Sequence, residues 1–283
     1  MPDLWIVDSF TNRAFRGNPA GVHLVTEFLE ASRMQQIASE LNLSETAFVC
    51  GDPNLEPRES PPDAYRIRYF SPKQEIPLCG HATLASAKVL FERTGLRQLT
   101  FQTGSEIQLD VCRRGDQIEM QFPIYDLVDA QAPESLLTAL GVTEVLEVGF
   151  NVETKILMIE IESSETLRAL SPDFSALLQS CDSINGLPLH GVSVTARAQD
   201  EYDFHSRFFW PWSGGSEDPV TGGTHTFLAK YWAHKLDKRA MRSFQASART
   251  GHMEVELKSS DTLLIRGQAV VILDARLRPL ARH

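Results

Sequence analysis

The spacing of apolar and polar residues predicts a chain that changes many times between strand and helix. Alternation with a period of two, or a β-branched run, predicts a strand, whereas apolar residues three or four positions apart predict a helix. Strands are predicted at residues 5–8, 22–25, 47–50, 65–70, 154–161, 192–196 and 204–210, with two or three more in 99–122 and a pair in 263–273. Helices are predicted around residues 34–41, 136–140 and 166–180. Glycines predict a turn at 17–21, and four prolines predict an exposed loop at 52–63.

One pattern of landmarks occurs twice along the chain. The skeleton E-x-P-x-x-G at residues 75–80 recurs at 217–222, 142 positions later (217 − 75). The same features flank both copies: Phe-x-Pro before them, at 70–72 and 209–211, and Phe-Gln after them, at 101–102 and 244–245. Because order and spacing both repeat, we predict two domains of similar fold. One contains residues 1–122, completed by a C-terminal strand from about 269–283, and the other contains residues 123–268.

Each copy predicts a turn that opens a helix, at residues 80–93 and 222–235. Gly80 and Gly222 leave the backbone uncovered at these points, and apolar residues follow them. A helix N-terminus carries unpaired N–H groups and a positive dipole end, which suit a carboxylate. Close packing of helix on sheet is the better explanation for either glycine alone, but the repetition favours a site. We therefore expect both N-termini to face one cleft and to bind one small anionic substrate.

Composition narrows the class of protein. The 283 residues are 42% hydrophobic, enough for two cores, and carry a net charge of −10. Because no basic stripe occurs, we expect no nucleic-acid or anionic-membrane partner. No apolar run approaches the ~20 residues of a membrane span, and the N-terminus lacks a secretory pattern. Four widely spaced cysteines predict free thiols in a reducing compartment, which favours the cytoplasm.

Three polar residues are candidates for the chemistry of the site, and each also has an ordinary structural explanation. Glu45 lies at a helix-to-strand junction among apolar residues, where a solvated carboxylate is the simpler interpretation. His81 follows the first helix-opening glycine, a place where a histidine more often caps or packs. Asp218 precedes the second helix, which it can cap.

Other chemistries find little support. The sequence contains no H-x-x-x-H pair, and His225 and His234 are nine positions apart, so we expect no metal site. No G-x-G-x-x-G follows a predicted strand, and Gly222 and Gly223 precede a threonine rather than the lysine of a phosphate loop. We therefore expect no nucleotide cofactor and no redox or ATP-driven reaction.

Five segments carry a resemblance to a known family. They are FRGNPAGV (15–22), LSETAF (43–48), FSP (70–72), EIPLCGHAT (75–83) and EDPVTG (217–222). Together they resemble the PhzF-like phenazine-biosynthesis family over nearly the whole chain. The resemblance implies the diaminopimelate-epimerase-like fold, an α+β architecture of two pseudo-symmetric domains, each a mixed β-sheet curled around a central α-helix. The internal duplication leads independently to the same two halves.

The resemblance also implies a function. The family's type reaction is the isomerisation of a dihydro-hydroxyanthranilate, in which a proton moves between ring carbons without a cofactor. The family implies a homodimer with its active site between the two halves. By resemblance, Glu45 is the catalytic acid/base, and His81 and Asp218 are its polar neighbours. The substrate-binding positions implied are Asn18, Gly80, Gly222 and Gly223.

One position departs from the family pattern, and three function classes stay open. The family usually has serine after Thr221-Gly222, whereas this chain has Gly223, so the type substrate does not transfer directly. We favour a Glu45-based isomerase of a small cyclic or unsaturated carboxylate. The alternatives are a one-thiol dehydratase or epimerase of a cyclic amino acid, which would use Cys79, and a non-catalytic binding protein on the same scaffold. Thr221 replaces the second cysteine of a two-thiol racemase and makes that mechanism unfavourable.

Overall fold

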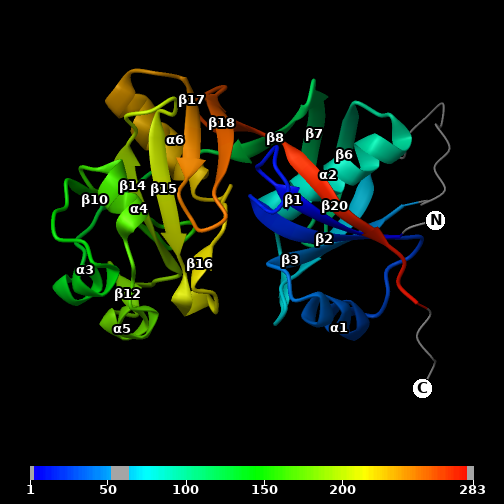
Figure 1. The fold of residues 1–283 in the computed structure, drawn as a ribbon, viewed down its shortest axis with the longest axis horizontal. Coiled ribbons are helices and arrows are strands. Elements are labelled where there is room, and N and C mark those ends of the chain that lie inside the picture. Colours follow the sequence, from blue (N-terminus) through cyan, green and yellow to red (C-terminus); the bar gives the residue numbers. More distant parts are fainter. Residues whose placement is uncertain (1–2, 52–63, 279–283) are drawn as a thin grey trace. The chain divides into compact units, whose positions relative to one another are not determined.

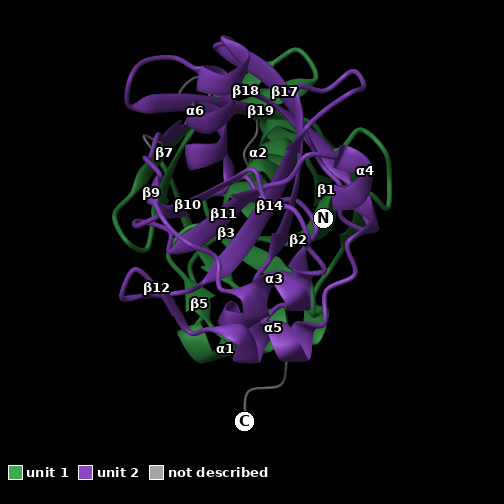
Figure 2. Ribbon diagram, turned by 90° about the vertical axis from the view of Figure 1, so that its left-hand side faces the viewer, with its two compact units in different colours: residues 1–121, 266–283 green, residues 122–265 purple. Residues whose placement is uncertain are grey.

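The computed structural model describes residues 3–51 and 64–278, and the chain divides into two compact units (Figure 1). Unit 1 comprises residues 1–121 and 266–283, and unit 2 comprises residues 122–265 (Figure 2). The repeat in the sequence predicts domain boundaries after residues 122 and 268. The proline-rich stretch 52–63 lies outside the described residues.

Unit 1 is built on a mixed sheet with two helices. Its strands are β1 (Leu4–Ser9), β2 (Asn18–Val25), β3 (Glu45–Cys50), β4 (Tyr65–Phe70), β5 (Glu75–Ile76), β6 (Gln98–Thr103), β7 (Gln108–Arg114), β8 (Gln117–Pro123) and β20 (Ala269–Ala275). They pair in the order β20-β1-β2-β3-β4-β6-β7-β8, with β5 beside β4. Helix α2 (Gly80–Thr94) packs on β1, β2, β3 and β20, while α1 (Ala31–Leu41) packs on β3 and β4.

Unit 2 has a sheet of the same kind. Its strands are β9 (Val128–Asp129), β10 (Glu147–Asn151), β11 (Ile156–Glu160), β14 (Gly191–Arg197), β15 (Phe204–Phe209), β16 (Glu217–Asp218), β17 (Ala240–Gln245), β18 (Gly251–Leu257) and β19 (Thr262–Gly267). The remaining elements are the hairpin β12 (Ser183–Ile184) and β13 (Leu187–Pro188), helices α3 (Glu134–Leu140), α4 (Ser164–Ala169), α5 (Phe174–Ser180) and α6 (His225–Leu236), and the 3₁₀ turn η1 (Pro211–Ser213). Helix α6 packs on β17 and β18.

The two sheets share one topology. Unit 2 pairs in the order β9-β10-β11-β14-β15-β17-β18, with β16 beside β15. In both units the third strand of this order is parallel to the fourth and the fifth to the sixth, and the other pairs are antiparallel. The α+β fold of two pseudo-symmetric halves is therefore confirmed.

The turn predicted at 17–21 lies earlier than expected, because the connection between β1 and β2 occupies residues 10–17. Gly17 is the one predicted turn residue outside β2, with φ +67° and with the carbonyl oxygen of Ser9 only 2.1 Å from the place of a Cβ atom. Asn18 already belongs to β2 and lies opposite Ser9. The strand tolerates Pro19 because β3 begins opposite Ala20, so only β1 flanks the proline.

Two predicted helices begin or end elsewhere. The helix predicted over 166–180 is two helices, α4 and α5, each with its own cap. Ser163 accepts hydrogen bonds from two N–H groups of α4, and Asp173 does the same for α5. Pro172 stands just before the second cap, where it cannot continue a helix. The second central helix, predicted from residue 222, begins at His225 because residues 222–224 form a turn of their own.

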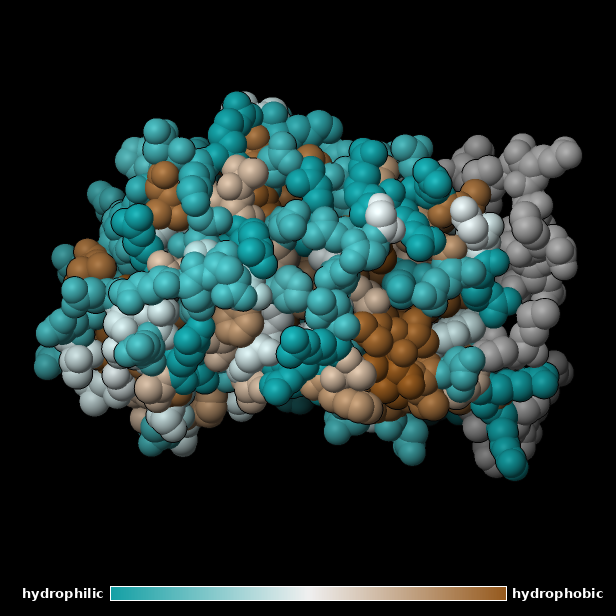
Figure 3. Space-filling view, turned by 45° about the horizontal axis from the view of Figure 1, so that its top comes forward, coloured by the Kyte–Doolittle hydropathy of each residue, from teal (hydrophilic) through white to brown (hydrophobic). Residues whose placement is uncertain are grey.

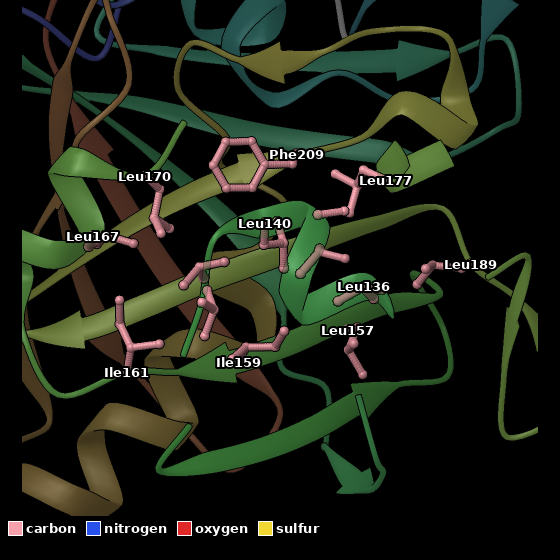
Figure 4. Packing of buried hydrophobic residues seen from close by; sticks show 14 of the residues in the cluster. Leu136, Leu140, Leu157, Ile159, Ile161, Leu167, Leu170, Leu177, Leu189 and Phe209 are labelled. Atoms are coloured by element: carbon pink, nitrogen blue, oxygen red, sulfur yellow. The ribbon is translucent and has the colours of Figure 1, made fainter. Parts of the chain in front are cut away.

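The core of unit 2 shows the period of two that the sequence predicts for its strands. In β14, Val192, Val194 and Ala196 pack into a cluster with residues of α3, α4, α5 and β11 (Figure 4). Thr195 points to the opposite face, where the indole N–H of Trp232 in α6 donates to its hydroxyl at 2.9 Å. The small helices thus cover one face of the sheet, and α6 covers the other.

Polar side chains dominate the surface drawn in Figure 3, where apolar side chains gather only in separate groups. Within residues 3–51 and 64–278, no helix has the length and apolar character needed to cross a membrane.

An arginine–glutamate fork occurs at the same place in both units. In unit 1, Arg68 donates from Nε and Nη2 to both carboxylate oxygens of Glu75, at 2.7 and 2.6 Å. In unit 2, Arg207 makes the same two bonds to Glu217, at 2.7 and 2.9 Å. Each fork fastens a short strand, β5 or β16, to the strand before it, and so positions the turn that leads to the central helix.

The two forks differ in burial. Arg207 is 8% exposed and also donates from Nη1 to the carbonyls of Leu167 and Leu170, at 3.2 and 2.6 Å. The side chains of Arg68 and Glu75 are 23% and 39% exposed. Water therefore screens the Arg68–Glu75 fork. Removal of one partner from the Arg207–Glu217 fork leaves a poorly solvated charge.

We predict that Arg207→Leu destabilises unit 2 by about 3 kcal/mol, because it strands the Glu217 carboxylate and two carbonyl groups. Arg68→Leu, the matched change at the exposed fork, should cost about 1 kcal/mol or less. Urea unfolding followed by circular dichroism measures both, and tryptophan fluorescence reports mainly on unit 2, which holds three of the four tryptophans. Equal losses in the two variants would contradict this assignment.

Candidate active site

The candidate site in unit 1 lies on the face of the sheet that α2 covers. Tyr69 of β4 hydrogen-bonds Thr83 of α2, and Ala47 lies opposite Tyr69 in the register, so odd-numbered β3 residues point to this face. Glu45 therefore points there as well. It pairs with Ala20 of β2, two positions beyond Asn18, so Asn18 shares the same face. Asn18 is fully buried.

Glu45, Cys79 and His81 form one buried cluster. Glu45 Oε2 lies 3.1 Å from His81 Nε2, and both side chains are less than a tenth exposed. The Cys79 sulfur lies 3.7 Å from Glu45 Oε2 and 3.4 Å from His81 Nδ1. Glu45 and His81 are site residues predicted from the sequence, and Cys79 is the basis of the alternative thiol mechanism.

Hydrogen bonds from the surrounding elements fix the start of α2. Cys79 is the N-cap residue, and its carbonyl accepts the hydroxyl of Thr83 at 2.7 Å. Since Thr83 gives its only proton there, Tyr69 donates to Thr83 at 2.6 Å. The Ser9 hydroxyl donates to the carbonyl of His81 at 2.8 Å. Nothing in the sequence pointed to Ser9 and Tyr69, because only folding brings their strands to the helix, nor to the bond that Thr83 makes at the start of its own helix.

Burial and neighbouring groups act on the cluster in opposite directions. Burial raises the pKa of the Cys79 thiol, and the nearby His81 only partly offsets this effect. Burial also disfavours a charge on His81, but Cys79 and Glu45 outweigh it and raise the pKa of His81 well above its usual value. Burial therefore makes the Cys79 thiol a weaker acid, while its neighbours favour a proton on His81.

The cluster also has the composition of a metal-ligand set. Within the described residues, Glu45, Cys79 and His81 are the group of His, Cys, Asp and Glu side chains whose ligand atoms all lie within 4.8 Å of one another. Sequence spacing did not reveal it, because Glu45 is 34 positions before Cys79. All four cysteines of the chain are free.

Gly80 is the first residue of α2 in unit 1, and the other predicted site residues belong to unit 2. Asp218 ends β16 and accepts a hydrogen bond from the Thr221 hydroxyl, while its carbonyl accepts the Gln245 amide at 2.6 Å. Asp218 does not cap α6 as suggested from the sequence, because the N-cap residue is Thr224. The proximity of Asp218 to Glu45 stays a prediction.

One hydrogen bond recurs at the turn before each central helix. The Thr83 hydroxyl donates to the Cys79 carbonyl, and in unit 2 His225 Nδ1 lies 2.9 Å from the Thr221 carbonyl. A carbonyl can only accept, so Nδ1 carries the proton. Nε2 is then the acceptor for the Ser243 hydroxyl at 2.8 Å. Thr83 and His225 thus bind equivalent carbonyls, those of the residues four positions before them, with different side chains.

The register identifies the counterpart of Glu45 in unit 2. Phe70 and Phe209 hold the same place in the repeat, and they lie opposite the second residue of β3 and of β14, respectively. The first residues of these strands, Glu45 and Gly191, are therefore equivalent. The carboxylate exists in unit 1 only.

The other members of the cluster are also replaced. Adding 142 to the positions of Cys79 and His81 gives Thr221 and Gly223. Neither counterpart ionises in the neutral pH range. Unit 2 keeps the scaffold of the turn and lacks the proton-carrying groups of unit 1.

A family comparison matches residues 7–275 to the family described as phenazine biosynthesis-like protein, PhzC-PhzF. The chain belongs to this family. An uncharacterized isomerase of Halalkalibacterium halodurans is 41% identical over 279 residues, which cover 97% of each chain. The mouse phenazine biosynthesis-like domain-containing protein 1 is 40% identical over 287 residues, covering 97% of this chain and 98% of the relative.

Solved structures agree with this family assignment. The crystal structure of a PhzC/PhzF protein from Clostridium difficile has a TM-score of 0.84 at 33% identity and covers 99% of this chain and 100% of that one. A protein of Agrobacterium radiobacter described as a probable proline racemase shares the fold at 10% identity, with a TM-score of 0.63. This PhzF-like protein is accordingly an isomerase with the epimerase-type fold.

We predict that His225 makes unit 2 less stable in acid. Burial lowers its pKa from the ordinary 6.5 to about 4, so between these values the unfolded chain binds a proton that the native protein does not. Stability is full above pH 6.5 and falls by about 1.4 kcal/mol per pH unit towards pH 4, about 3 kcal/mol in total.

The matched variant is His225→Thr, which places in unit 2 the residue type that unit 1 has at Thr83. It should lower stability at neutral pH, since the ring leaves a cavity. Between pH 6.5 and 4, the free energy of unfolding of the variant should fall by about 3 kcal/mol less than that of the wild type. Urea unfolding at several pH values measures the difference, and parallel curves would show that His225 is not responsible.

Proposed function

We propose that this chain is a cofactor-independent isomerase of a small cyclic or unsaturated carboxylate, with Glu45 as the general acid/base. The observation that carries the proposal is the buried Glu45–His81 pair, 3.1 Å apart, at the start of the central helix of unit 1. Buried ionisable pairs with perturbed pKa values occur preferentially at functional sites. The family's isomerases and the absence of this pair from the repeat in unit 2 support a single proton-carrying centre.

In the proposed reaction, one proton changes carbon atoms and the double bond moves with it. Glu45 in its acid form gives its proton to one carbon, and the resulting carboxylate takes a proton from another, which restores the acid. The substrate gains and loses one proton, so no oxidant or reductant is needed. His81 stabilises the carboxylate form by its charge. In this proposal Asp218 completes the polar surroundings.

The substrate's own carboxylate is proposed to bind the backbone that opens the central helices. Gly80 is the first residue of α2, where N–H groups and the helix dipole favour an anion. Gly222 and Gly223 stand in the turn before α6, where Gly223 is exposed and Gly222 is buried. Asn18 is proposed as a further contact. The proposal includes a homodimer in the cytoplasm, with no nucleic-acid or membrane partner.

A one-thiol mechanism is the second candidate, because the Cys79 sulfur lies 3.4 Å from His81 Nδ1. A thiolate could take a proton from a cyclic amino acid, which is the mechanism that the resemblance implies for racemases of this fold. Burial works against it, since the pKa of the Cys79 thiol is raised rather than lowered. The neutral thiol is a poor base, and we therefore favour Glu45.

We predict that Glu45→Gln lowers the isomerisation rate by ~10² to 10⁴-fold, since the amide keeps the size of the side chain but cannot carry the proton. Substrate binding should survive. Cys79→Ala should lower the rate less than about tenfold, because the thiol only packs in this mechanism. Proton exchange between substrate and D₂O, followed by NMR, measures both variants. Full activity in Glu45→Gln together with loss in Cys79→Ala would transfer the role to the thiol.

Gly223 offers a test of the substrate class. A Cβ atom at this position would meet nothing within 4 Å, so Gly223→Ser should fold with unchanged stability. The hydroxyl restores what the family usually has there. We expect the variant to gain activity on a dihydro-hydroxyanthranilate relative to the wild type, measured side by side. Gly223→Ala is the matched control, and an equal gain with alanine would mean that the hydroxyl is not what selects the substrate.

A further inference from the structure

The Glu45–Cys79–His81 cluster has the dimensions of a tetrahedral metal site. In a tetrahedral Zn²⁺ site with bonds of about 2.0–2.3 Å, the nitrogen and oxygen donors are about 3.3 Å apart and a sulfur is about 3.5–3.6 Å from either. Here Nε2 and Oε2 are 3.1 Å apart, Sγ and Oε2 are 3.7 Å apart, and Sγ and Nε2 are 3.9 Å apart. Each separation lies within about 0.3 Å of the tetrahedral value. A side-chain shift of a few tenths of an ångström would complete the geometry.

The donors determine which ion fits. One imidazole nitrogen, one sulfur and one carboxylate oxygen form the borderline-soft set that Zn²⁺ accepts. Mg²⁺ and Ca²⁺ take six or more oxygen ligands, and this cluster supplies a single carboxylate. A thiolate and a carboxylate together carry two negative charges, which balance the charge of a divalent ion in a buried place.

The protein backbone already holds the three donors in place. Glu45 stands on β3, paired to β2 on one side, and Cys79 and His81 belong to the fixed start of α2, where Thr83 and Ser9 hold their carbonyls. Little reorganisation is therefore required, and the three protein ligands leave a fourth position open. Zn²⁺ binding displaces the thiol proton of Cys79 and the proton on His81 Nε2, and both pass to solvent.

We propose that Zn²⁺ binds Glu45, Cys79 and His81 with one solvent or substrate oxygen, and that it inhibits the isomerase. Binding depends only on the cluster, whereas inhibition rests on the proposed function of Glu45. An ion on Oε2 and Nε2 occupies the atoms that would carry the proton. Zinc availability would thereby regulate an enzyme that does not use a metal in its reaction.

The test uses Zn²⁺ alone, without a substrate, on full-length protein carrying no polyhistidine tag. Competition with a chromophoric chelator should give one equivalent bound at micromolar or tighter affinity. Cys79→Ala should weaken binding at least about 10²-fold, more than the loss of an outer-sphere contact usually does. Cys50→Ala is the matched control, since Cys50 is another buried thiol of unit 1, at the far end of β3, and should bind as the wild type does.

Co²⁺ in place of Zn²⁺ identifies the ligands directly. The wild type should show a thiolate-to-cobalt charge-transfer band and the intense visible bands of tetrahedral Co²⁺, and Cys79→Ser should lose the first. Equal zinc affinity in wild type and Cys79→Ala, or a cobalt spectrum without a thiolate band, would overturn the site. The Co²⁺ spectrum of the wild type shows by itself whether a thiolate binds the metal, even if the variants fail to fold. Failure here leaves the Glu45 mechanism intact, because that mechanism is tested by Glu45→Gln on substrate.

Discussion

A buried carboxylate sets the conditions for the rest of unit 1. Glu45 is 6% exposed, and a buried charge that loses its partner costs about 3–5 kcal/mol. His81 is that partner, so its position has to be exact to within a hydrogen bond. The chain achieves this by making His81 the second residue of α2 and by holding the helix start through Ser9, Thr83 and Tyr69. Helix α2, the four strands that it packs on and its cap together hold Glu45 and His81 in contact.

Duplication explains the scaffold but not the chemistry. Both units repeat the strand order, the arginine–glutamate fork and the side chain that holds the carbonyl before the helix turn. Unit 1 also takes a strand from the far end of the chain, because β20 follows β19 of unit 2 and pairs with β1. This strand ties the sheet of unit 1 to both ends of the sequence. Only unit 1, however, carries a carboxylate, a thiol and an imidazole together.

This asymmetry distinguishes the protein from a symmetric two-base enzyme. An epimerase that removes a proton on one face and returns it on the other needs one carrier in each half. Here the counterparts of the unit 1 carriers are Gly191, Thr221 and Gly223, none of which can carry a proton at neutral pH. A single centre that both gives and takes a proton is consistent with an isomerase that moves a double bond. The same concentration of donors in one place creates the metal-ligand geometry.

The sequence by itself determined the duplication, the α+β class and most strands, because these depend on periodicity and on repeated landmarks. It also singled out Glu45 and His81, although only the resemblance gave them roles. It placed the start of α6 three residues early, since the glycine turn at 222 resembles a helix start in sequence but forms hydrogen bonds of its own.

Tertiary structure alone decided which residues meet. Sequence could not bring Glu45 to Cys79, because the two stand 34 positions apart on a strand and a helix, and it could not show that Gly191 is the counterpart of Glu45. It gave no sign of Tyr69, Thr83 or Ser9 either. Local patterns report the period of a single element, whereas contacts across a sheet depend on strand order and register. Those are fixed only when the apolar faces of distant segments pack together.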